Sequence, residues 1–180
     1  GEGYVFVEDR LKDMIISGGA NIYSPEVERV LAEHPAVMEC AIIGVPDDTW
    51  GETVKAVVAL KPDTSATEAE IIEYCREHLA HFKCPKSVDI LEALPRNPTG
   101  KILKKDLRAQ AARAREEFND ALSEFLDWVA MSMEAGQGHA QALPAASQIG
   151  TLRVFDEIRT AIDLAPSRGI TAWEALGQMG

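Results

Sequence analysis

The sequence DRLKDMIISGGANIYSPEVE, residues 9–28, decides the fold of the first part of this chain. Its apolar run, Met14-Ile15-Ile16, predicts a short β-strand. The run Ser24-Pro25-Glu26 predicts a helix start, because serine is a good N-cap, proline suits the first helical position and glutamate favours the positive end of the helix dipole. A strand followed so closely by a helix indicates a domain that mixes the two.

The sequence on both sides of this stretch continues the alternation across residues 1–108. Further strands are predicted at 4–7, 37–45, 53–60 and 88–91, where β-branched and aromatic residues cluster. The first helix is expected to end before Pro35. A capping box from Thr67 to Glu70 opens a second helix to about Ala80, and a last helix follows Lys101. These elements predict a small α+β domain with helices packed on a few strands.

Residues 109–180 have a different character. They are rich in alanine, and all of their basic residues are arginine. Helices are predicted at 110–135, 139–149, 151–164 and 171–178, with glycines and prolines between them. The first of these helices carries an apolar stripe at helical spacing, made of Phe118, Leu122, Phe125, Leu126 and Val129. We therefore predict an all-α helical domain over 109–180, whose stripe forms a helical core or a self-association face.

Composition excludes several classes of protein. The net charge is −11, and nucleic-acid binding needs a basic face, so no nucleic-acid partner is expected. The three cysteines (Cys40, Cys75 and Cys84) are odd in number and unevenly spaced, which indicates reduced thiols in a cytoplasmic protein. No apolar run reaches the roughly 18 residues of a membrane span, and no leader precedes the first strand. The chain opens at the edge of that strand, which we expect of a segment cut from a longer protein.

The motif that carries the most chemistry is the loop LPRNPTGK, residues 94–101. Two prolines limit its backbone and Gly100 permits a tight turn, so Lys101 is expected on a shaped loop. An ammonium group there can meet a carboxylate and an α-phosphate together, and can stabilise negative charge as a mixed anhydride forms. An NTPase phosphate loop is excluded, because its first glycine would fall at Pro95 and Ile102 follows the lysine. A solvated lysine in a proline-rich turn is the alternative.

Two other kinds of site are excluded. Cys75, His78, His81 and Cys84 recur at every third residue. On a helix each such step turns by about 300°, so the four side chains span roughly half the circumference and cannot converge on one metal ion. A Ser/His/Asp hydrolase is not indicated, because no Gly-x-Ser-x-Gly elbow is present. We therefore predict no metal site.

Six ordered motifs within residues 1–108 resemble the C-terminal domain of the acyl-CoA synthetases, in the superfamily of adenylate-forming AMP-binding enzymes. The first is residues 9–28, which is similar to the hinge and glycine-loop motif of this superfamily. The other motifs are HPAV (34–37), GVPD (44–47), WGE (50–52), FKCPK (82–86) and the lysine loop. The resemblance covers 60 % of the chain and implies that the first domain is the small lid domain of such a ligase.

The resemblance implies a reaction in two steps. A carboxylic acid and ATP give an acyl-adenylate and pyrophosphate, and the small domain then rotates so that the thiol of CoA can attack the adenylate. Lys101 matches the catalytic lysine of the first step. Arg10 matches the residue that approaches the ribose and phosphates, and Lys12 matches the hinge, which needs only to absorb a backbone change. The alternative for both is a surface charge beside Asp9 and Asp13.

The resemblance also implies a CoA site. Gly18 and Gly19 match the loop that enters the active site after rotation, where glycine lets the backbone approach a ligand closely. Trp50 and Phe82 match positions that line the approach of CoA. The alternatives are a plain turn at the glycines and core packing of the two rings. Cys84 stands where some relatives carry a basic residue near the CoA phosphates.

The complete enzyme implied by this resemblance uses ATP or AMP, CoA and Mg²⁺. It also has a large N-terminal domain with the ATP phosphate loop and the acyl pocket, which these 180 residues do not contain. We therefore expect that domain as the partner of this chain. We expect the chain alone to bind none of these ligands tightly and to form no acyl-CoA. The acid substrate is not encoded here, because its pocket belongs to the other domain.

Residues 118–180 resemble a second family, the cytoplasmic helical domain of the F-type proteins of type II secretion and Tad pili. The resemblance rests on residues 125–136, Gln141-Ala142-Leu143 and residues 171–180. It implies a different class of function, a helical interaction module of a secretion or pilus platform fused to a vestigial lid domain. Its partner would bind through 110–135. An unrelated helical docking tail is the alternative.

Overall fold

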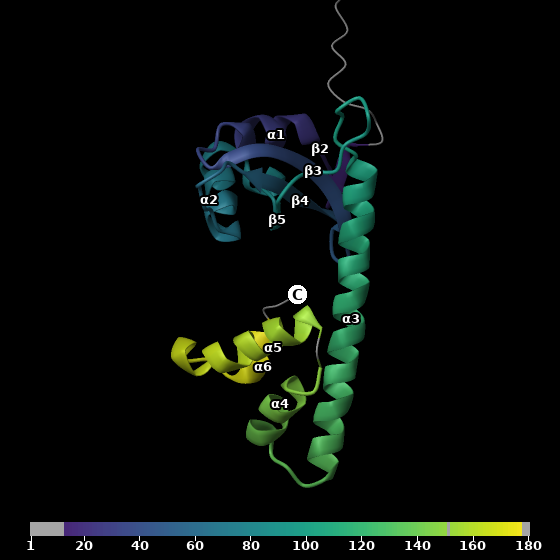
Figure 1. Cartoon of the computed structure of the whole chain (residues 1–180), viewed down its shortest axis with the longest axis vertical. Coiled ribbons are helices and arrows are strands. Elements are labelled where there is room, and N and C mark those ends of the chain that lie inside the picture. The colour runs from purple at the N-terminus through teal and green to yellow at the C-terminus, as the bar shows by residue number, and fades with distance from the viewer. Residues whose placement is uncertain (1–12, 151, 178–180) are drawn as a thin grey trace, which may run out of the picture. The chain divides into compact units, whose positions relative to one another are not determined.

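The computed structural model describes residues 13–150 and 152–177 (Figure 1). The strand predicted at 4–7 and two predicted site residues, Arg10 and Lys12, lie outside the described residues. The chain divides into a first unit, Gly1–Ala112, and a second unit, Arg113–Gly180. Each unit has a hydrophobic core of its own.

The first unit is built on a five-stranded sheet whose central strand is β4 (Gly51–Leu60). β3 (Val37–Asp47) pairs antiparallel along one edge of β4. Two strands share the other edge: β1 (Ile15–Ser17) meets β4 at Gly51, and β5 (Ser87–Leu91) runs parallel to β4 from Lys55 onward. β2 (Ala20–Ile22) forms a hairpin with β1. Among the described residues, this edge of β4 therefore has no strand partner at 52–54.

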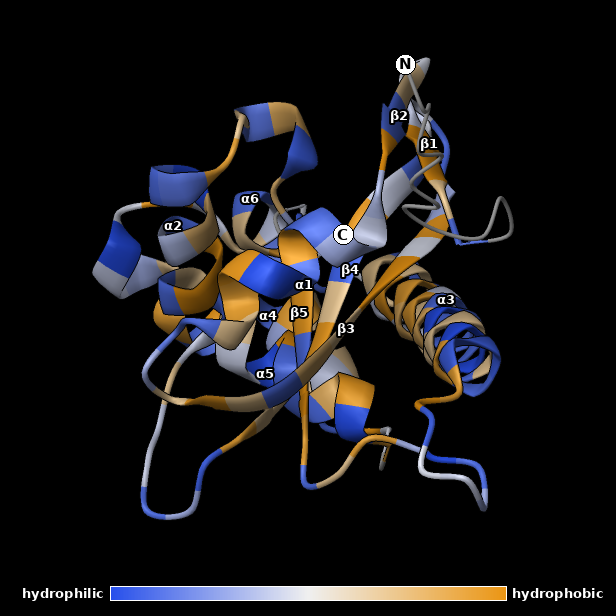
Figure 2. Cartoon of the chain, turned by 90° about the horizontal axis from the view of Figure 1, so that it is seen from above, coloured by the Kyte–Doolittle hydropathy of each residue, from blue (hydrophilic) through white to orange (hydrophobic). Residues whose placement is uncertain are grey.

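Both faces of the sheet are covered. On one face, α1 (Ser24–Ala32) and α2 (Glu68–His78) share a core with the strands, made of Ile15, Ile22, Val27, Leu31, Val37, Ile42, Val54, Ala56, Val58, Ile71, Cys75, Cys84 and Val88. The second core joins the strands to the 92–103 loop and to the first turns of α3 (Lys104–Glu134), through Ala41, Ile43, Val57, Ala59, Leu94 and Leu107. Because successive strand residues point to opposite faces, β3 and β4 supply both cores. Figure 2 shows the apolar runs of these strands in orange.

The predicted small α+β domain is confirmed, and two of its details differ. β2 was not predicted, since three residues give too short a pattern to recognise. The predicted N-cap of α1 is wrong. Tyr23 stands at the N-cap position, without a capping hydrogen bond from its side chain, and Ser24 is the first residue of the helix. The hydroxyl group of Ser24 is buried and accepts a hydrogen bond of 2.6 Å from Lys104 Nζ. The oxygen that was expected to cap α1 therefore bonds a lysine of α3.

The predicted capping box of α2 is confirmed. Thr67 Oγ1 accepts from the backbone N–H of Glu70 (3.3 Å), and Glu70 Oε2 accepts from the backbone N–H of Thr67 (2.7 Å). The hydrogen bonds that the Glu70 carboxylate accepts from the backbone N–H and from the hydroxyl group of Thr67 lower the pKa of Glu70. The carboxylate stabilises the helix start while it is ionised, so its contribution is lost as the pH falls through that lowered pKa.

The helix α3 is longer than predicted. The sequence suggested one helix after Lys101 and another over 110–135, whereas the structure has one continuous helix, Lys104–Glu134. Its 31 residues contain no glycine or proline, so nothing in the local sequence interrupts the ladder of backbone hydrogen bonds. The division between the two units therefore falls inside a helix, at Ala112 and Arg113.

The described part of the second unit consists of helices. After the end of α3 come α4 (His139–Ser147), α5 (Arg153–Leu164), the short η2 (Pro166–Arg168) and α6 (Ala172–Leu176). Their core is made of Ala121, Phe125, Val129, Ala142, Leu143, Ala146, Phe155, Ile158 and Ile162. Two members of the predicted stripe are not part of this core: Leu126 is 42 % exposed, and Phe118 is only partly buried. The buried face of the helix carries Ala121, Phe125 and Val129, which follow one another at intervals of four residues.

Candidate functional site

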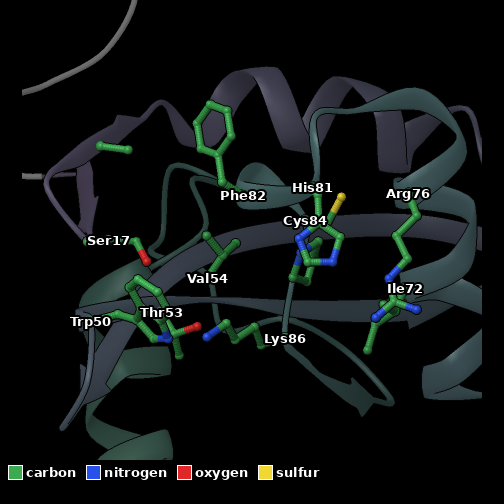
Figure 3. A pocket seen from close by; sticks show the side chains of 13 residues that line it. Ser17, Trp50, Thr53, Val54, Ile72, Arg76, His81, Phe82, Cys84 and Lys86 are labelled. Carbon is green, nitrogen blue, oxygen red and sulfur yellow. The ribbon is translucent and has the colours of Figure 1, made fainter.

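A cavity of about 540 Å³ opens in the first unit, where β4 changes its edge partner (Figure 3). It is lined by Ser17, Gly18, Ala20, Trp50, Thr53, Val54, Ile72, Arg76, His81, Phe82, Cys84, Pro85 and Lys86. The hairpin β1–β2, the start of β4, α2 and the segment around η1 (His81–Lys83) all contribute. Segments far apart in the sequence therefore meet at this edge of the sheet.

Trp50 is held by the backbone at the entrance of β4. Asp47 Oδ1 accepts hydrogen bonds from the N–H groups of Thr49 (2.9 Å) and Trp50 (2.8 Å). The carbonyl oxygen of Trp50 accepts from the N–H of Gly18 at 2.9 Å. Lys86 Nζ lies 5.1 Å from the centre of the Trp50 ring, within range of a cation–π contact. The indole is still 49 % exposed, so its surface is available to a ligand.

The turn that carries Gly18 and Gly19 needs glycine. Both residues have positive φ angles, +57° and +82°. A Cβ atom on Gly18 would lie 2.7 Å from Cε3 of Trp50, whereas one on Gly19 would meet no atom within 4 Å. The hairpin is tied to β4 by Glu52, whose Oε2 accepts from the N–H of Ile16 at 2.9 Å. The close approach of Gly18 to the indole is therefore a built feature of the pocket.

Phe82 reaches the pocket from η1. This short helix is joined to α1 by an ion pair between Lys83 Nζ and Glu26 Oε1, at 2.6 Å. Phe82 is 55 % exposed, and Trp50 is exposed to a similar degree. Two large aromatic rings thus remain open at one cavity, which argues against the interpretation of either ring as a core residue.

The charged groups of the pocket are basic. Its lining contains Arg76, His81 and Lys86 and no carboxylate, in a chain whose net charge is −11. Arg76 is joined to Glu73 by a partly exposed ion pair of 3.2 Å. In Figure 3, Arg76 and Trp50 lie toward opposite sides of the cavity. Such a pocket favours an anion that also carries an apolar or aromatic part.

Two smaller polar groups complete the lining. The hydroxyl oxygen of Thr53 is buried and has no hydrogen-bond partner among the described residues. Burial raises the pKa of the Cys84 thiol, although the nearby Arg76 acts in the opposite direction. Cys84 is therefore a protonated, weakly polar group at neutral pH, and the positive charge comes from its neighbours.

Lys101 lies outside this pocket, on the loop between β5 and α3. The loop folds back on itself through an antiparallel bridge between Arg96 and Ile102. Lys101 is exposed, and its ammonium group makes no hydrogen bond or ion pair with the residues that the structure describes. The loop thus presents a free cation on a shaped backbone, which fits both the catalytic role and the alternative of a solvated lysine.

The structure brings together three of the four predicted CoA residues. Gly18, Trp50 and Phe82 line one pocket, whereas Gly19 does not line it. The lining residues that the sequence did not assign to this site include Thr53, Arg76, His81 and Lys86. The motif FKCPK contained a signal for Lys86, but nothing in the sequence linked Arg76 to it. Within residues 13–150 and 152–177, the structure shows no group of three acidic, histidine or cysteine side chains able to hold a metal ion.

Comparison with known families gives a match in the first unit. Residues 26–101 match the family model of the AMP-binding enzyme C-terminal domain. Lys101 is the last residue of this match. Among the described residues, no helix combines the length and the hydrophobicity that crossing a bilayer requires.

Curated relatives and solved structures agree with this match. The chain is 53 % identical over 109 residues to the long-chain-fatty-acid–CoA ligase FadD13 of Mycobacterium tuberculosis, covering 61 % of this chain and 22 % of that protein. It is 50 % identical over 108 residues to a Rhodococcus jostii ligase that joins a methyl-dioxo-octahydroindenyl propanoyl group to CoA, covering 60 % and 21 %. A solved M. tuberculosis fatty acyl CoA synthetase matches with a TM-score of 0.57 at 51 % identity, over 63 % of this chain and 22 % of that one. The chain thus spans about a fifth of the length of these relatives.

Proposed function

Residues 26–101 form a C-terminal domain of the AMP-binding enzymes, and from this premise we propose that the chain supplies the mobile lid of an ATP-dependent carboxylic acid–CoA ligase. Its partner is a large N-terminal domain that binds ATP and the acid. One observation carries the proposal: Gly18, Trp50 and Phe82, assigned to CoA by motif alone, converge on one basic pocket. This convergence of three separate motifs supports a shared CoA site in the first unit.

In the first half-reaction we assign the catalytic role to Lys101. The acid and ATP carry negative charge that redistributes as the acyl-adenylate forms and pyrophosphate leaves. An ammonium group without an internal partner can stabilise that charge, because it loses no existing ion pair when the substrates arrive. The exposed loop position of Lys101 supports this role. Arg10 at the nucleotide and Lys12 at the hinge remain part of the proposal, on sequence grounds.

In the second half-reaction we assign CoA to the pocket. CoA combines an aromatic base, phosphate groups and a flexible arm that ends in the thiol. The exposed rings of Trp50 and Phe82 suit the apolar parts of such a molecule. Lys86 and Arg76 suit its phosphates. The backbone of Gly18 borders the same cavity, where a narrow arm can pass close to the main chain.

The other parts of the proposal rest on the family alone. Mg²⁺ would accompany the phosphates of ATP in the large domain. The cytoplasmic location stays a prediction from the sequence, and the identity of the acid is set in the large domain. None of the comparisons supports the secretion-module alternative for the second unit, and its resemblance to F-type proteins stays a prediction.

The proposal is tested with a hybrid ligase. The segment of M. tuberculosis FadD13 that aligns with this chain is replaced by residues 1–180, and acyl-CoA formation is measured with palmitate, ATP and CoA. We expect the hybrid to form acyl-CoA, whereas FadD13 truncated before that segment forms none. A folded hybrid that binds ATP but forms neither acyl-adenylate nor acyl-CoA would overturn the proposal.

A second experiment addresses the CoA pocket. In the hybrid, Gly18→Ala is expected to raise the KM for CoA by about tenfold more than Gly19→Ala does, roughly the effect of 1.4 kcal/mol. Both changes place alanine at a positive φ, so backbone strain is common to them. The added Cβ contacts the Trp50 ring only at Gly18. Equal KM values for the two variants would remove the indole from the CoA site.

A further inference from the structure

We propose that Glu39, on β3, is a positioning residue that orients Lys101 through Arg96. The inference rests on the proposed role of Lys101 in adenylation, and it concerns a residue outside every motif that the sequence singled out. Glu39 is 62 positions from Lys101 in the sequence. It acts at a distance, because its carboxylate joins the sheet to Leu94 and Arg96 of the loop that carries the lysine.

Glu39 contacts the loop with both of its oxygen atoms. It lies on the sheet face that packs against the loop, as Ala41 and Ile43 do, and its side chain is 17 % exposed. Oε1 accepts a hydrogen bond of 3.2 Å from the N–H of Leu94. Oε2 forms an ion pair with Nη2 of Arg96. Partial burial keeps this pair from being fully screened by water.

Arg96 carries the constraint from the sheet to the tip of the loop. Its second terminal nitrogen, Nη1, donates to the carbonyl oxygen of Gly100 at 2.5 Å. The planar guanidinium group therefore holds Glu39 on one side and the residue before Lys101 on the other. Lysine could not do this, since its single ammonium group lacks the fixed fork of donors.

The tip itself is closed around Asn97. Its Oδ1 accepts from the backbone N–H groups of Thr99 (3.1 Å) and Lys101 (2.8 Å). Its own N–H donates to the carbonyl oxygen of Lys101 at 2.9 Å. Both backbone polar groups of Lys101 are thus satisfied by one residue, and Gly100 supplies the positive φ of +85° that the turn needs. This frame fixes the backbone of Lys101, and with it the point from which the side chain leaves the loop.

A fixed direction matters for the proposed chemistry. A misplacement of about 1 Å in a reacting group can cost about a hundredfold in rate. The base of the loop is also fixed, since Leu94 is buried and the N–H of Leu103 donates to the carbonyl oxygen of Pro95 at 2.8 Å. What remains adjustable is the tilt of the tip relative to the sheet, and Glu39 with Arg96 restrains that tilt.

The chain offers a matched control. Lys55 Nζ and Asp89 Oδ1 form an ion pair of 2.8 Å on the same sheet, between β4 and β5. Each pair joins one side chain that is 17 % exposed, Lys55 or Glu39, to one that is about half exposed, Asp89 at 44 % or Arg96 at 46 %. If both ion pairs serve only to stabilise the fold, loss of either pair should have the same effects on the two half-reactions.

The experiment measures the two half-reactions of the hybrid ligase separately. Adenylation is followed by ATP–pyrophosphate exchange, and thioesterification by adding CoA to acyl-adenylate. We expect Glu39→Gln to lower the adenylation rate by about tenfold or more and to leave thioesterification within about twofold. Asp89→Asn is expected to leave both rates within about twofold. Glu39→Asp, which keeps the charge, is expected to recover part of the adenylation rate.

A readout without catalysis uses the 180-residue chain itself. Amide hydrogen exchange is expected to become faster at Gly100 and Lys101 in Glu39→Gln than in Asp89→Asn, at equal thermal stability. Unchanged exchange at these amides, or equal loss of both half-reactions in Glu39→Gln, would overturn the positioning role. If Lys101→Ala leaves adenylation intact while exchange at the loop responds to Glu39→Gln, the proposed function fails and the mechanical link between Glu39 and the loop stands.

Discussion

Replacement of Lys101 by alanine in the hybrid ligase is expected to slow acyl-adenylate formation by about 10²–10³-fold, the usual effect of removing one group that stabilises charge in a transition state. The thioesterification of acyl-adenylate supplied from outside should stay within about twofold, because the resemblance places Lys101 in the first step alone. The measurement is ATP–pyrophosphate exchange for the first step and acyl-CoA release for the second. Lys101→Arg is expected to restore little, since a guanidinium group differs in shape and size from an ammonium group.

Lys105→Ala is the control for a loss of surface charge. Lys105 is exposed like Lys101 and lies four residues further on, at the start of α3. It is expected to leave both half-reactions within about twofold. If Lys101→Ala and Lys105→Ala gave the same adenylation rate, Lys101 would be the solvated lysine of the alternative interpretation, and the catalytic assignment would be wrong.

Replacement of Phe125 by alanine is expected to lower the free energy of unfolding of the second unit by about 3–5 kcal/mol, because it removes a fully buried ring and leaves a cavity. Phe125 is 0 % exposed and contributes to a core made entirely of second-unit residues. Urea unfolding followed by tryptophan fluorescence measures the effect. Trp128 and Trp173 lie in the second unit, so a Trp50→Phe background restricts the signal to it.

Leu126→Ala is the matched control for Phe125→Ala. The two residues are neighbours on α3, but Leu126 is 42 % exposed. Its replacement should change the free energy of unfolding by about 0.5 kcal/mol or less. Equal losses for the two variants would contradict the burial pattern of this helix. The pair also decides which part of the predicted apolar stripe forms the core.

The elements of the first unit could largely be predicted from local sequence. β3, β4 and α2 follow from β-branched runs and from a capping box whose partners are three residues apart. β2 and the exact start of α1 could not be predicted, because they depend on contacts with distant residues. Ser24 shows this well: its hydroxyl group bonds Lys104, which is 80 positions away in the sequence.

Only part of the candidate site could be predicted, again because some of its residues are brought together by distant contacts. Gly18, Trp50, Phe82 and Lys101 belong to motifs that can be recognised one at a time. Arg76 and Thr53 belong to no such motif, and they join the pocket only because α2 and β4 are packed beside the hairpin. Glu39 was missed because its partner, Arg96, lies 57 positions further along the chain, on the lysine loop. Sequence patterns give the residues with local signals, and tertiary packing adds the others.

The shielding of the three cysteines bears on how the proposed motion of the first unit can be observed. Desolvation raises the pKa of Cys40 and of Cys75 to about 12, and burial raises that of Cys84 as well. These thiols are therefore protonated at neutral pH, and the thiolate is the species that maleimide dyes attack. A cysteine introduced at an exposed position such as Lys105 would therefore take a fluorophore selectively. The native thiols can remain in place while a fluorophore at this position reports on the proposed lid motion in the hybrid ligase.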